Sequence, residues 1–90
     1  YNRILELFPD HSVAYASRAS LETTEKFYDA ALMDWDKAIE NDQQNIGYLV
    51  SKAELLILME RKAEARRTLD DAVRKGAIRG QLRDLYHKAK

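Results

Sequence analysis

The sequence predicts an all-α protein, an α-α superhelix of antiparallel helix pairs that repeat along the chain. Helix-forming residues dominate the 90 positions, with three Gly and one Pro. No window alternates for long between apolar and polar residues, as a half-buried strand would. The second half of the chain also repeats the pattern of small and large residues in the first half, 34 residues later. Together these observations favour a repeat protein made of helices.

The composition excludes several classes of protein. Lys and Arg total 15 and Asp and Glu total 15, so no basic excess is available for neutralising nucleic-acid phosphates. The absence of Cys excludes disulfides, thiolate zinc sites and cysteine nucleophiles. The longest apolar run, Leu55–Met59, falls far short of the roughly 20 residues that span a membrane, so no membrane insertion is expected. The length allows one domain. The composition assigns no cellular compartment.

The first residues predict the end of one helix and the beginning of another. Tyr1–Phe8 carries apolar residues at helical spacing, and Pro9 disfavours helical dihedrals in the residue before it. Because the chain begins inside this pattern and without Met, we expect a piece of a longer protein. Asp10–Ser12 offers side chains for an N-cap. A helix is then expected over Val13–Thr24, with Leu21 among its bulky residues and a turn after it.

Two helices are predicted in the middle of the chain. Tyr28–Asn41 is amphipathic, and its small residues share a face with Trp35, which is therefore expected in the core. A polar segment follows and ends at Asn45, a good N-cap residue. Ile46–Met59 is the next helix and the most apolar one.

The last third of the chain predicts two further helices. Lys62–Lys75 carries opposite charges four residues apart, which favours surface ion pairs of a few tenths of a kcal/mol each. These pairs are Arg66 with Asp70 and Arg67 with Asp71. Gly76 stands where a C′ glycine would end this helix. A closing helix is expected over about Arg79–Ala89.

Alanine recurs at the interval of 34 residues and indicates where helices approach each other closely. A larger side chain at such a contact would push the paired helices apart. The matched pairs are Ala19 with Ala53, Ala31 with Ala65, and Ala38 with Ala72.

The repeated positions have a recognisable outline of small and aromatic residues. The first repeat reads Tyr15, Arg18, Ala19, Glu22, Ala31, Trp35, Ala38 and Gln43, and the second reads Leu49, Lys52, Ala53, Leu56, Ala65, Leu69, Ala72 and Ala77. This outline resembles the tetratricopeptide repeat family. The sequence departs from the family pattern at Arg18 and Lys52 in a leucine slot, at Glu22 in an aromatic slot, and at Gln43 and Ala77 in the proline slot.

The resemblance divides one domain, residues 1–90, into four parts. Residues 1–9 are the end of a preceding repeat, 12–45 the first full repeat, 46–79 the second, and 79–90 a capping helix. Each helix pair leaves an apolar face that a neighbouring pair covers. The resemblance implies a non-catalytic scaffold that binds a partner protein or peptide.

In this family the first helices of the pairs line a concave groove, which the resemblance transfers to the matching positions here. The groove residues would be Val13, Ala16, Ser17, Ser20, Thr24, Val50, Ser51, Glu54, Ile57, Leu58, Gln81 and Asp84. The small first patch would let a partner backbone approach, and the apolar end near Leu58 could hold an anchor side chain. Packing between helices is the alternative role for Ile57 and Leu58.

Three other functions are weighed against groove binding. Some members of the family bind the C-terminal carboxylate of heat-shock chaperones through Lys, Arg and Asn, but this groove has no cationic fork and Glu54 would repel a carboxylate. The chain could instead be a structural end piece that forms homo-oligomers or packs within its parent. An enzyme has no support, because no residue set suggests a catalytic, cofactor or metal site.

The remaining polar residues are interpreted as surface groups. His11 and His87 lack a second ligand at metal-binding spacing. Glu22 and Glu25 are interpreted as exposed carboxylates at a helix end. An acidic stripe is expected to be solvated, and a basic partner is its alternative; its members are Asp34, Asp36, Glu40 and Asp42.

Overall fold

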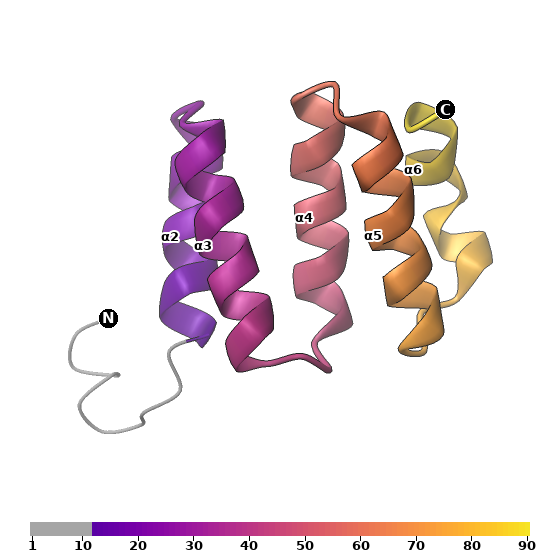
Figure 1. Cartoon of the computed structure of the whole chain (residues 1–90), viewed down its shortest axis with the longest axis horizontal. Coiled ribbons are helices and arrows are strands. Elements are labelled where there is room, and N and C mark those ends of the chain that lie inside the picture. The colour runs from indigo at the N-terminus through magenta and orange to yellow at the C-terminus, as the bar shows by residue number, and fades with distance from the viewer. Residues whose placement is uncertain (1–11) are drawn as a thin grey trace. The chain divides into compact units, whose positions relative to one another are not determined.

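The structure is a computed structural model that describes residues 12–90, and every regular element in that range is a helix (Figure 1). The all-α prediction is therefore confirmed. The expected end of a preceding repeat, residues 1–9, lies outside the described residues. The elements are α2 (Ser12–Thr24), α3 (Tyr28–Asn41), α4 (Ile46–Leu58), α5 (Lys62–Arg74), the 3-10 helix η1 (Arg79–Leu82) and α6 (Arg83–Lys88).

The chain forms two compact units that divide between Gln43 and Gln44. In the first unit α2 and α3 pack side by side (Figure 1). Ala19, Ala31 and Ala38 have no exposed surface, and Trp35 is 7% exposed. Because alanine leaves only a methyl group at each contact, the two helices approach closely, as the recurring alanines predicted.

The second unit repeats this arrangement with α4 and α5 (Figure 1). Ala53, Ala65 and Ala72 are again fully buried, and Leu69 occupies the position of Trp35 with no exposed surface. Asn45 caps α4, as predicted, because its side-chain oxygen accepts a hydrogen bond from the Tyr48 backbone N–H at 3.2 Å.

Three helices end in the same hydrogen-bonded turn with a positive φ. The residues after the C-caps of α2, α4 and α5 are Lys26, Glu60 and Gly76, with φ of 66°, 62° and 120°. After α5, the Gly76 N–H donates to the Val73 carbonyl and the Ala77 N–H to the Ala72 carbonyl, both at 3.0 Å. This pair of bonds is the Schellman motif, and it confirms the predicted C′ glycine.

The closing segment differs from the single helix expected over Arg79–Ala89. It consists of η1 followed by the short helix α6, with Leu82 and Ala89 buried. The Tyr86 hydroxyl donates to the Asp70 carboxylate at 2.6 Å, and the Arg66 guanidinium donates to the Ala89 carbonyl. These contacts attach the closing segment to α5.

The same contacts correct the predicted ion pairs on α5. Arg66 and Asp70 both turn to the closing segment, and Asp71 pairs with Arg74 three residues later. Spacing along a helix could not reveal the first two partners, because they come from another element.

Within residues 12–90, no helix is long and apolar enough to span a membrane.

Candidate functional site

The first candidate surface is the outer face of α2. Its residues recur at helical spacing, so one face carries Val13, Ser17, Ser20 and Thr24. Val13 is 44% exposed, Ser20 and Thr24 are exposed, and Ser17 is half-buried. The Thr24 hydroxyl donates to the Ser20 carbonyl at 3.1 Å, so part of the polar character of this face is used within the helix. Ala16 is buried at 8% exposure.

The matching surface on α4 is more apolar. Leu58 is 56% exposed and Glu54 is exposed, while Val50, Ser51 and Ile57 are half-buried. An exposed leucine at the end of a helix is available to a partner side chain, whereas the half-buried residues contribute mostly to packing within the unit. The last two predicted groove residues, Gln81 in η1 and Asp84 in α6, are both exposed.

The polar residues in the unusual repeat positions of the first unit form a network between its two helices. Arg18 on α2 donates from Nε to Asp34 Oδ2 at 2.8 Å and from a terminal nitrogen to Asp34 Oδ1 at 2.7 Å. The Asp34 side chain on α3 is 6% exposed, and the Arg18 side chain is 60% exposed. This forked pair supplies a charge-assisted contact at an otherwise alanine-rich helix interface.

Glu22 completes this network and differs from its expected role. The bond from Arg18, opposed by burial, lowers the pKa of Asp34. The pKa of Glu22 is raised, first because its protonated carboxyl can hydrogen-bond to Asp34 and then because of burial. Glu22 Oε1 is buried and accepts no hydrogen bond within the described residues, which also favours the neutral form. Glu22 is therefore half-buried against α3 rather than an exposed carboxylate.

The expected acidic stripe on α3 is also corrected. Asp34 is buried at 4% exposure, Asp36 and Glu40 are exposed, and Asp42 is half-buried. The four carboxylates thus do not share one solvated face.

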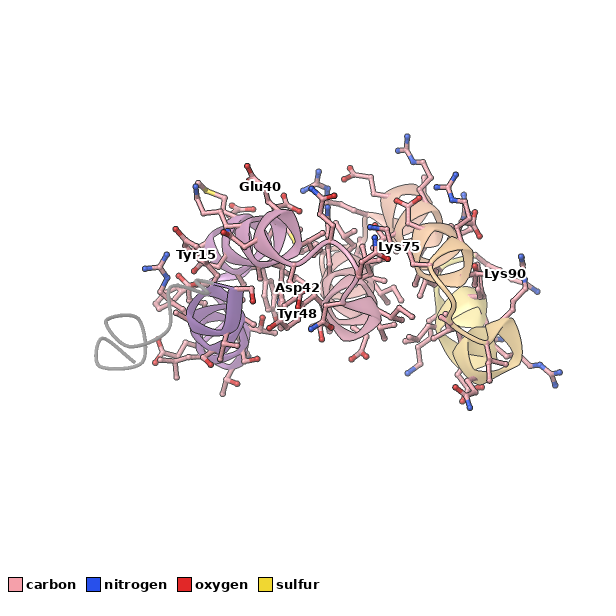
Figure 2. All side chains as sticks on the ribbon, turned by 90° about the horizontal axis from the view of Figure 1, so that it is seen from below. Tyr15, Glu40, Asp42, Tyr48, Lys75 and Lys90 are labelled. Carbon is pink, nitrogen blue, oxygen red and sulfur yellow. The ribbon has the colours of Figure 1, made fainter. Side chains whose placement is uncertain are left out.

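Nearby, Tyr15 (labelled in Figure 2) has Arg18 at 5.5 Å and Lys37 at 5.9 Å from its ring centroid, so cations flank this part of the interface.

No group of three or more His, Cys, Asp or Glu side chains within residues 12–90 is arranged to hold a metal ion. His87 is exposed, and His11 lies outside the described residues.

Comparisons with known proteins agree with this architecture. No protein-family model matches the chain, and no curated protein matches it. Among solved structures, the chain is similar to the TPR2B domain of yeast Sti1 in its complex with pHsp70. The TM-score is 0.84 and the identity is 28%, over 99% of this chain and 76% of that one. The buried alanines, the paired helices and this structural similarity together show that the chain has the fold of a tetratricopeptide repeat domain.

Proposed function

We propose that this chain is a protein-interaction module that binds a peptide or helix of a partner protein through exposed residues of α2 in the first unit and of α4 in the second. The observation that carries the proposal is its similarity, at 28% identity, to a tetratricopeptide repeat domain solved with a bound partner. The exposure of Val13 and Leu58 supports it, because both side chains are free to contact a ligand.

The chemistry of these faces favours a ligand with an apolar anchor. None of the groove residues on α2 and α4 is Lys or Arg. A ligand held mainly by its terminal carboxylate would need such cations, and the exposed Glu54 would repel it. Leu58 offers apolar surface instead, and Ser51, two turns earlier on the same helix, leaves room for a peptide backbone to approach. The proposed ligand is therefore recognised mainly by an apolar side chain, whereas a chaperone tail would be recognised by its terminal carboxylate.

Selection of peptides from a displayed random library on the immobilised 90-residue chain tests this function. We expect enriched peptides to share an apolar residue and to bind equally well with an amidated C-terminus. A double Val50→Glu and Leu58→Glu variant should lose this binding. Met33→Glu is the matched control, because Met33 is 63% exposed on α3 and lies outside the proposed surface.

Two results would contradict the proposal. One is equal binding by the double variant and the chain itself. The other is a dimer, measured by light scattering, that buries Val50 and Leu58 and dissociates in the double variant. The second result would favour self-association, the alternative role of the chain.

A further inference from the structure

A pocket outside the proposed groove residues opens on the closing segment. It has a volume of about 380 Å³ and is lined by Arg79, Gly80, Arg83 and Tyr86. All four residues belong to the second unit. A Cβ built on Gly80 would meet no atom within 4 Å, so the backbone there borders open space.

Neither arginine of this pocket forms an ion pair with a carboxylate of residues 12–90. The ion pairs within residues 12–90 involve other cations, and Arg79 instead lies over the Tyr86 ring, 4.7 Å from its centroid. Stacking on the ring restricts the Arg79 guanidinium, so less conformational entropy is lost when it binds an anion. Two arginines in one cavity can therefore bind an anion without breaking an ion pair within the described residues.

The pocket and the proposed groove use different faces of the closing segment. Arg79, Arg83 and Tyr86 recur four and three residues apart, whereas Gln81 and Asp84 fall between them. The Tyr86 hydroxyl reaches Asp70 on α5, the second helix of its pair. The pocket is thus on the side of α5, while the proposed ligand surface uses the first helices α2 and α4.

We propose that this pocket binds a carboxylate group of an acidic peptide segment. Guanidinium groups present paired N–H donors whose spacing matches the two oxygens of a carboxylate. The Asp70 carboxylate beside Tyr86 offsets part of the positive charge of the two arginines. The remaining charge suits a singly charged carboxylate better than a doubly charged phosphate. This site is independent of the proposed ligand surface on α2 and α4.

Titration of the ¹⁵N-labelled 90-residue chain, followed at the arginine Nε–Hε resonances, tests the site. The probe is N-acetyl-tetraglutamyl amide, which has side-chain carboxylates and no free terminus. We expect saturable shifts of the Arg79 and Arg83 resonances. Arg83→Gln should weaken binding about tenfold, the effect of losing one charge-assisted hydrogen-bonded partner. Arg83→Lys should weaken it less, since the charge remains without the fork.

The controls separate this site from general charge attraction and from the groove. Arg67→Gln removes an exposed arginine on α5 outside the pocket and should leave the affinity unchanged. Leu58→Glu should also leave it unchanged, so failure of the proposed groove and failure of this site are distinguishable. Equal shifts with the tetraglutaminyl peptide, equal weakening by Arg67→Gln, or absence of saturation would overturn the proposal. Tighter binding of inorganic phosphate than of the peptide would overturn the assignment to a carboxylate.

Discussion

The two repeats place different chemistry at equivalent positions between their helices. In the first repeat Arg18, Glu22 and Asp34 form a polar network across α2 and α3. In the second repeat the residues 34 positions later are Lys52, Leu56 and Thr68. Leu56 is fully buried, and the Thr68 hydroxyl bonds to the Glu64 carbonyl of its own helix at 2.9 Å.

This comparison separates what the fold requires from what it tolerates. The alanines at the closest contacts are fully buried in both repeats, so close approach is required. The neighbouring positions accept either apolar packing or a polar network, in which the Arg18–Asp34 bonds are satisfied while Glu22 Oε1 accepts no hydrogen bond within the described residues. The Asp34 side chain of the ion pair is buried and the Arg18 side chain is 60% exposed. Because the cost of removing Asp34 from water offsets much of the attraction, the network need not make the first repeat more stable than apolar packing does.

Truncating the large core residue of each repeat should cause the largest loss of stability. The two losses then show which core contributes more to the free energy of unfolding. Trp35→Ala should cost about 3–5 kcal/mol of the free energy of unfolding, and Leu69→Ala about 2–5 kcal/mol. Trp35 is the sole tryptophan, so urea unfolding should be followed by circular dichroism at 222 nm. A loss below about 1 kcal/mol in Trp35→Ala would contradict its role as the centre of the first unit.

Exchange of the network for the residues of the second repeat tests the comparison directly. The triple variant Arg18→Lys, Glu22→Leu and Asp34→Thr should be as stable as the natural chain or about 1–4 kcal/mol more stable. Asp34→Thr alone should destabilise by about 1–3 kcal/mol, because Glu22 and Arg18 lose their shared acceptor. If the triple variant is less stable than the single one, the two repeats do not follow the same packing rule. Thermal and urea unfolding measure both changes.

The pH dependence of stability should reveal the network, because its two carboxyl groups shift in opposite directions. The raised pKa of Glu22 gives stability that is present below the unfolded pKa and lost as pH rises through the folded pKa. The lowered pKa of Asp34 gives stability that is present above the unfolded pKa and lost as pH falls through the folded pKa. The network is therefore strongest while Asp34 is charged and Glu22 is still protonated.

Glu22→Gln should remove the loss at high pH, because glutamine donates a hydrogen bond to Asp34 at every pH. Relative to the natural chain, its advantage should grow with pH and reach about 1 kcal/mol near neutrality. Glu25→Gln controls for the lost charge, since Glu25 is exposed in the same part of the chain. A pH-independent difference between Glu22→Gln and the natural chain would show that Glu22 does not share a proton with Asp34.

The smallest change in stability is expected from glycine at the positive-φ positions that follow α2 and α4, and it should be equal in the two repeats. Lys26 and Glu60 both adopt a positive φ, which costs a residue with a Cβ more than it costs glycine. Lys26→Gly and Glu60→Gly should each stabilise the chain by about 0.5–1 kcal/mol. Gly76→Ala should do the reverse, through backbone strain alone, because the added Cβ would meet Ile46 at an ordinary 3.6 Å. Melting temperatures of the three variants check this order.

Much of the fold could be predicted from the sequence because it depends on local patterns. The four long helices begin and end within one residue of their expected bounds, since the periodicity of the apolar residues and the turn segments between them are local signals. The contacts between elements were harder to predict from the sequence. Glu22 and Asp34 each looked like surface carboxylates on their own helix, and their contact depends on how α2 and α3 pair. The one available signal was that a carboxylate and a basic residue replaced apolar residues in the same repeat.

Burial shows the same limit. Leu21 and Leu55 coincide in the repeat, yet Leu21 is 58% exposed and Leu55 is 1% exposed. Periodicity fixes where a side chain lies on its helix, but the covering atoms belong to other elements. For the candidate site, the helix faces could be predicted from spacing, whereas the burial of Ala16 and the pocket at Arg79 and Arg83 required the packed structure.

The bond from Arg66 to the Ala89 carbonyl has a consequence for how the module can vary. Its acceptor belongs to the main chain, which every amino acid at position 89 would retain. Its donor is a side chain, so a substitution at position 66 alone can remove this bond and leave the Tyr86–Asp70 bond as the remaining polar contact described here between α5 and the closing segment. Natural variants should therefore tolerate many small residues at 89 while keeping a long donor at 66.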